Sequence, residues 1–162
     1  MTALLAIAVT QLYEKEPTIG FAREVAQAPP LLATQKSKFK VSIFNGTKKS
    51  IKVPSEKCSS GYEMISFQLI SPAGRDYDIT RKPKPWIGNV QIPEEIPSTG
   101  LVIRKINFGD GTWEGFPSYI PGSGDGWKIR VKAHVEDSKF FRDNGFWTGD
   151  MESKFTPATR KD

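Results

Sequence analysis

The chain has little of the chemistry from which enzyme and metal sites are usually built. Among its 162 residues there is one cysteine, Cys58, and one histidine, His134. A lone cysteine excludes an internal disulfide, and this pair cannot form a Cys/His zinc set. We interpret Cys58 as a free, partly buried thiol and His134, on the polar side of an alternating segment, as solvent-facing rather than a catalytic base. We therefore predict that the protein is not an enzyme and uses no cofactor or metal.

Long hydrophobic runs are also missing. The apolar stretch Ala3–Val9 is too short to cross a bilayer, so no transmembrane segment is predicted. It is similar to the core of a signal peptide, but no basic residue precedes it. We interpret residues 1–34 as an N-terminal extension: a signal remnant, an added strand or a short helix over Thr18–Ala28 that two prolines end. Residues 35–162 are expected to form the main domain.

No block of like charge is present. The 23 basic and 18 acidic residues are interspersed and leave a net charge of +5. Proteins that bind nucleic acid usually cluster basic residues along the phosphate backbone. Because this chain has no such cluster, no nucleic-acid partner is expected, and the lysines are interpreted as a solvated face. Fourteen glycines and twelve prolines indicate many turns, and the length is that of one domain.

What the chain does contain is an alternation of apolar and polar residues with period two, which is typical of strands with one buried face. Trp127–Val135 is the clearest example, because its apolar side chains alternate with Lys, Arg and His. The pattern predicts strands over residues 38–44, 50–53, 62–71, 76–80, 101–108, 127–135 and 146–156. About seven strands with turns between them indicate an all-β, antiparallel sandwich.

The connections have their own signals. Asn45-Gly46 predicts a hairpin turn after the first strand, and Pro72–Arg75 predicts another, with Gly74 able to adopt positive φ. The segment Lys82–Trp86 contains two prolines, which remove ladder donors, so an extended connection is expected there.

Three groups of residues carry a resemblance to a known family: Gly61–Trp86, Thr112–Pro117 with Trp127–Glu136, and Phe146–Lys154. Over roughly residues 38–158 the chain resembles uncharacterised bacterial immunoglobulin-like domains of envelope-associated or secreted proteins. The resemblance implies an immunoglobulin-like β-sandwich and an extracytoplasmic location, whether periplasmic, envelope or secreted. It implies no reaction and no ligand.

The most informative candidate residues are aromatic. Trp86, Trp113 and Tyr119 fall in predicted loops or at strand ends, where tryptophan faces can stack on sugar rings. The carboxylate pairs, such as Asp76 with Asp78, are interpreted as turn and edge residues because no apolar pocket is indicated around them.

These observations favour a non-catalytic binding or structural module of a bacterial exported or envelope protein, with another protein or a cell-surface glycan as partner. Two alternatives stay open. One is a carbohydrate-binding module that uses Trp86, Trp113 and Tyr119, which requires exposed, coplanar rings. The other is a protease-inhibitor-like domain that presents the loop Pro117–Gly126.

Overall fold

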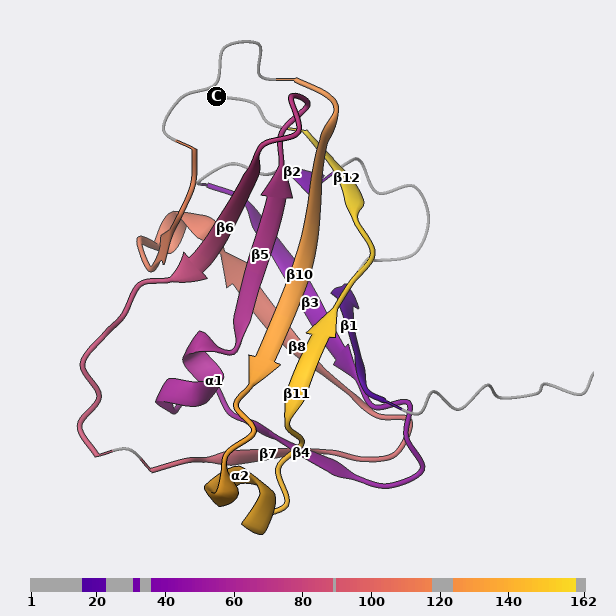
Figure 1. The fold of residues 1–162 in the computed structure, drawn as a ribbon, viewed down its shortest axis with the longest axis vertical. Coiled ribbons are helices and arrows are strands. Elements are labelled where there is room, and N and C mark those ends of the chain that lie inside the picture. Colours follow the sequence, from indigo (N-terminus) through magenta and orange to yellow (C-terminus); the bar gives the residue numbers. More distant parts are fainter. Residues whose placement is uncertain (1–15, 23–30, 33–35, 89, 118–123, 160–162) are drawn as a thin grey trace, which may run out of the picture.

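The computed structural model describes residues 16–22, 31–32, 36–88, 90–117 and 124–159. Strands dominate these residues (Figure 1), and the helices are short. The strands are β1 (Thr18–Phe21), β2 (Leu31–Leu32), β3 (Lys38–Phe44), β4 (Ile51–Pro54), β5 (Ile65–Ile70), β6 (Asp76–Arg81), β7 (Pro93–Ile96), β8 (Leu101–Asn107), β9 (Trp113–Glu114), β10 (Trp127–Val135), β11 (Gly149–Glu152) and β12 (Thr156–Thr159). The helical turns are α1 (Ser59–Glu63), η1 (Phe108–Asp110) and α2 (Lys139–Asp143).

The strands form three sheets. One has the order β1-β3-β8, a second the order β2-β12-β10-β5-β6-β9 with β11 also on β10, and β4 pairs with β7 in a third. Each ladder is antiparallel except the short one between β12 and β2. The predicted all-β, antiparallel class is therefore confirmed.

The core lies between the first two sheets, which form two layers in Figure 1, with β3 and β8 behind β5 and β10. Phe67 of β5 joins them, since its ring centroid lies 5.4 Å from that of Phe39 on β3 and 5.2 Å from that of Phe108. Alternate residues of β10, beginning with Trp127, are buried as the period-two pattern predicted. The same alternation in β5 and β8 buries one face of each strand.

The predicted hairpin at Pro72–Arg75 is confirmed. β5 and β6 pair directly, the Ser71 N–H donates to the Arg75 carbonyl at 2.9 Å, and Gly74 has φ +79°. The hairpin predicted at Asn45-Gly46 is wrong, because β3 pairs with β1 and β8 whereas β4 pairs with β7. Asn45 is fully buried, and its side-chain amide donates to the carbonyls of Ile96 and Pro97. Its role is to fasten the end of β3 to the β7–β8 turn.

Three local predictions are corrected. Thr18–Phe21 is strand β1 and not helical, because it pairs with β3 and buries Ile19 in the core; the rest of the predicted helix lies outside the described residues. Residues 62–63 belong to α1, so the strand predicted from Tyr62 begins at Ile65. The last predicted strand is divided into β11 and β12.

That division is a β-bulge. Lys132 faces Glu152 across the β10–β11 ladder, whereas Ile129 faces Thr156 across the β10–β12 ladder, so the outer strand holds one extra residue between them. The Ser153 hydroxyl accepts the Val131 N–H at 3.1 Å and replaces the interrupted ladder bond. β11 and β12 therefore both remain paired with β10.

Candidate binding surface

The three aromatic residues predicted from the sequence do not form one exposed platform. Trp113 opens β9 and is only 4% exposed, as part of the core. Trp86 follows β6 and is half-buried, and Tyr119 lies outside the described residues. A stacking face needs an open ring, and the face of Trp113 is covered by the Arg81 guanidinium, whose carbon lies 4.0 Å from the ring centroid. The described rings thus do not favour the carbohydrate-binding alternative.

Trp86 and Trp113 are instead the two ends of an alternating stack of aromatic rings and cations. Arg81 lies between Trp113 and Tyr62, 5.0 Å from the centroid of the latter. Lys84 lies over both the Tyr62 and the Trp86 ring, with its Nζ 4.3 Å and 4.0 Å from their centroids. Such cation–π contacts contribute from about 0.5 kcal/mol at exposed sites to about 2 kcal/mol when desolvated. We call these five residues the cation–aromatic stack.

Local sequence explains how the stack forms. Tyr62 stands on α1, directly after the β4–α1 link, and its hydroxyl donates to the Lys82 carbonyl at 3.3 Å. Arg81 ends β6, where it faces Trp113 in the β6–β9 register. Lys84 and Trp86 follow in a segment that its two prolines keep out of any sheet, so the predicted extended connection is confirmed. The connection is thereby anchored at its β6 end.

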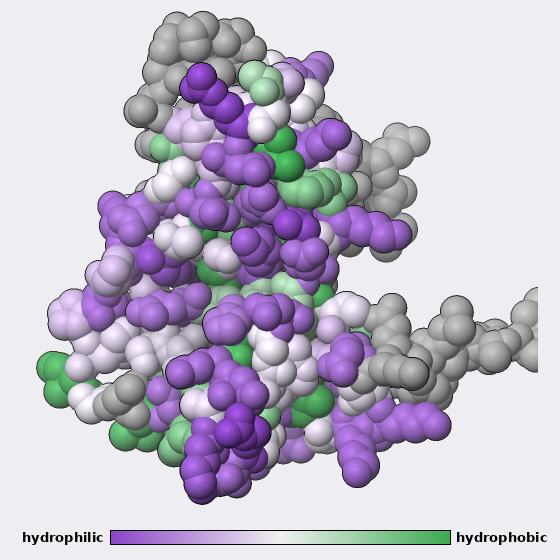
Figure 2. Space-filling view, in the orientation of Figure 1, coloured by the Kyte–Doolittle hydropathy of each residue, from purple (hydrophilic) through white to green (hydrophobic). Residues whose placement is uncertain are grey.

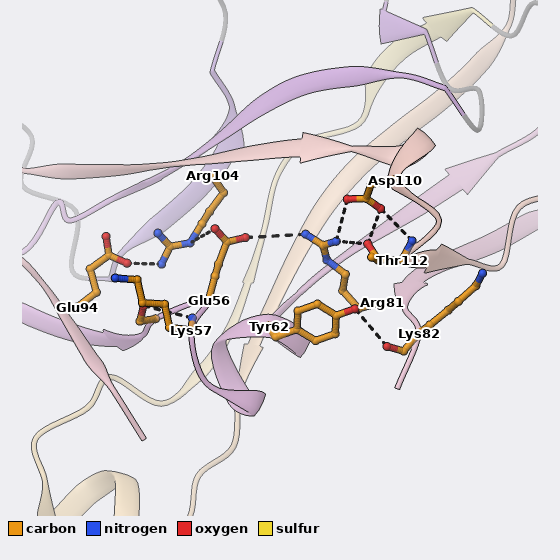
Figure 3. Close-up of polar contacts among 10 residues, drawn as sticks. Glu56, Lys57, Tyr62, Arg81, Lys82, Glu94, Arg104, Asp110 and Thr112 are labelled. Atoms are coloured by element: carbon orange, nitrogen blue, oxygen red, sulfur yellow. Dashed lines mark hydrogen bonds and ion pairs between the residues drawn. The ribbon is translucent and has the colours of Figure 1, made fainter. Parts of the chain in front are cut away.

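An ion-pair network continues from Arg81 beneath the stack (Figure 3). Glu56 lies between two guanidinium groups, 3.9 Å from Nη2 of Arg81 and 3.8 Å from Nε of Arg104. Arg104, inward-facing on β8 and 4% exposed, makes its shorter contact with Glu94, at 2.5 Å. Arg81 also contacts Asp110 at 3.4 Å. The network connects β6, β7, β8 and the β4–α1 link, and so holds in place the elements that carry the stack.

Asp110 of this network has a lowered pKa. Burial opposes its ionisation, but the hydroxyl and backbone N–H of Thr112 donate to it and Arg81 attracts it, so its pKa is lowered. A carboxyl with a lowered folded-state pKa stabilises the fold above its unfolded pKa, and this contribution is lost as pH falls through the folded value.

We therefore expect the free energy of unfolding of Asp110→Asn to fall less steeply between pH 5 and pH 2 than that of the wild type, with the two differing most at neutral pH. Urea titrations at a series of pH values measure this. Glu114→Gln, which removes an exposed carboxylate of the same region, is the matched control and should follow the wild type. If the free energies of unfolding of the wild type and Asp110→Asn change in parallel with pH, the lowered pKa of Asp110 is contradicted.

Beyond the stack, the β6–β7 connection exposes an unusual amount of apolar side chain. Ile87 is 104% exposed, Val90 74% and Ile92 39%. Figure 2 shows hydrophobic residues along the lower left margin, where Figure 1 places this connection. Single exposed apolar residues are ordinary, but a run of them in one loop marks an interaction site. We call the described residues of this segment, 82–88 and 90–92, the apolar connection.

A pocket of about 400 Å³ lies beside Trp113. Its lining joins Lys82 and Glu114 with Phe108 and Phe116, together with three glycines of residues 109–115. Lys82 is held there by donating from Nζ to the Gly111 carbonyl at 2.9 Å. The pocket has the volume of a small-molecule site, but its two charged side chains, Lys82 and Glu114, have opposite signs.

The residues considered for catalysis are not arranged for it. His134 lines a cavity of about 270 Å³ with Ser60 and Glu136, and its Nδ1 lies 2.8 Å from Asp150. Both partners are exposed, at 66% and 83% of their side chains, so water screens the pair. Cys58 is a free thiol but is 2% exposed, and its Sγ donates to the Ser55 carbonyl. In the part of the chain that the structure describes, no three metal-ligating side chains converge.

In comparisons with known proteins, no family model, no curated protein and no solved structure matches the chain. Within the described residues, no helix has the length and hydropathy to cross a membrane. The loop Pro117–Gly126, considered for protease inhibition, is described only at its two ends.

Sequence reasoning missed the most exposed part of this surface. Ile87 and Val90 were passed over because they belong to no period-two segment. Their position was the available signal. Apolar residues in a proline-flanked stretch that cannot enter a sheet are not expected to pack in the core, so they should be exposed. Tyr62 and Arg81 were likewise missed, since only tertiary contacts bring α1 against the end of β6.

Proposed function

We propose that this chain is a non-catalytic binding module with an immunoglobulin-like β-sandwich, and that the apolar connection is its binding surface. The observation that carries the proposal is the exposure of Ile87 and Val90 on a connection that the cation–aromatic stack holds in place. Ordering a loop before binding lowers the entropy lost on association.

The strand pairing supports the fold assigned in this proposal. β3 pairs with β8 and β5 pairs with β10, as strands B with E and C with F pair in immunoglobulin-like domains. β12 beside β10 would then be strand G, and β1 beside β3 would be strand A. The sequence resemblance to bacterial envelope-associated domains supports an extracytoplasmic location for the module.

Replacing the exposed apolar side chains tests the proposal. We expect the wild type to co-sediment with a bacterial cell-envelope fraction, and the double variant Ile87→Ser, Val90→Ser to bind about tenfold more weakly, because two apolar side chains no longer leave water on binding. Neither side chain belongs to the core, so the melting temperature should stay close to that of the wild type.

The matched control is Leu101→Ser on β8, since Leu101 is 57% exposed and lies in the β1-β3-β8 sheet. This variant should bind as the wild type does. Equal losses in both variants, or no binding by the wild type, would overturn the assignment of the surface.

A further inference from the structure

We propose that the partner of the apolar connection is an anionic lipid surface, into whose interface Ile87 and Val90 insert while lysines contact the headgroups. This inference rests on the proposed function and names the partner of the same surface. It is argued from the shape, the aromatic support and the charge of the connection.

The apolar side chains project from the surface. Ile87 is fully exposed and Val90 is 74% exposed, and neither lines the pockets of about 400 and 270 Å³ that the described residues form. A projecting apolar loop requires a protein partner to offer a matching groove, whereas a fluid lipid interface adapts to it. The shape therefore favours lipid.

Trp86 has the setting of an interfacial aromatic. Its ring is half-buried, with the edge-on Tyr62 ring 5.7 Å away and the Lys84 ammonium 4.0 Å from its centroid. Tryptophan concentrates at membrane–water interfaces, and lysine extends past it to the headgroups with its stem in the apolar region. Trp86 and Lys84 directly precede Ile87, so the chain passes from interfacial to apolar residues within three positions.

The charged side chains within the apolar connection are positive. The apolar connection contains Lys82 and Lys84 and no acidic residue, and neither lysine has a carboxylate partner within the described chain. Glu56 and Glu94, the carboxylates of the supporting network, are already paired with arginines. Anionic lipid headgroups supply the missing counter-charge, and each lysine near such a surface adds to the attraction.

Vesicle co-sedimentation tests this partner directly. We expect the wild type to bind vesicles of phosphatidylglycerol and phosphatidylcholine in equal parts, with binding weakened by high salt and much weaker on phosphatidylcholine alone. Ile87→Ser, Val90→Ser and, separately, Lys82→Gln, Lys84→Gln should each lower the affinity about tenfold. Lys105→Gln on β8, with Leu101→Ser, gives the matched control and should bind as the wild type does.

Tryptophan emission adds a readout that adsorption elsewhere would not give. Trp113 and Trp127 are in the core and Trp147 is partly buried against it. The blue shift that Trp86 contributes on vesicle addition should be lost in Trp86→Phe, which still binds. Loss of envelope binding in Ile87→Ser, Val90→Ser without any vesicle binding would overturn the lipid partner but leave the proposed surface intact with a protein partner. Vesicle binding that ignores these substitutions would overturn the lipid contact, and binding to neither envelope nor vesicles would overturn both proposals.

Discussion

Gly61→Ala is expected to destabilise the fold by about 3 kcal/mol, although a glycine within a helix is usually a weak point. A Cβ at this position would lie 2.0 Å from the Ser55 carbonyl oxygen and 2.6 Å from that of Pro54. Both contacts are with backbone, which cannot rotate away as a side chain can. The helix must therefore shift, and with it Tyr62, the central ring of the cation–aromatic stack.

Urea unfolding of the variant measures this loss. Helix propensity alone predicts the opposite sign, a gain of up to about 1 kcal/mol, so the two effects are separated by direction as well as size. Gly20→Ala on β1 is the matched control, because no heavy atom lies within 4 Å of its Cβ position, and its stability should change by less than about 0.5 kcal/mol. A Gly61→Ala protein as stable as the wild type would show that α1 does not pack as described.

Glu94→Ala is expected to cost about 3 kcal/mol, and Glu56→Ala only about 1 kcal/mol. Arg104 has a side chain 5% exposed, and its contact with Glu94 is 2.5 Å against 3.8 Å for Glu56. Removing Glu94 leaves a buried cation with one distant partner. Removing Glu56 leaves Arg104 with Glu94 and Arg81 with Asp110, and Glu56 is itself 41% exposed.

A double-mutant cycle isolates this interaction. In an Arg104→Met background the buried charge is absent, so Glu94→Ala should then cost less than about 1 kcal/mol. The interaction energy between Arg104 and Glu94 is obtained from the free energies of unfolding of the wild type, the two single variants and the double variant. If Glu56→Ala costs as much as Glu94→Ala, or if the cycle shows no coupling, the network does not rest on the Arg104–Glu94 pair.

The strands were predictable wherever a single face is buried. Trp127–Val135 matches β10 from end to end, because the buried face of a long central strand leaves an unbroken alternation in the sequence. For Thr18–Phe21 an added strand and a short helix both stayed open, because four residues hold too few repeats to distinguish the two periods. Its strand pairing with β3 depends on residues twenty or more positions away.

The candidate site was less predictable, for a physical reason. Trp86 was found from its residue type, but whether a tryptophan is open or covered depends on which cation lies against it, and Arg81 covers Trp113. Arg104 alternates with the apolar residues of β8 and is buried, yet nothing in that strand indicates that Glu56 and Glu94 neutralise it. Charge pairing across three elements leaves no periodic signal.

The pairing of β3 with β8 and of β5 with β10 has a kinetic consequence. In each of these two ladders the partner residues are about sixty positions apart in the chain, so neither ladder can form from a local hairpin. The β5–β6 hairpin is the exception, because a short turn joins its strands. We infer that this hairpin forms early and that folding waits on the two long closures, which places the chain with the slow-folding β proteins, on timescales of about milliseconds to seconds.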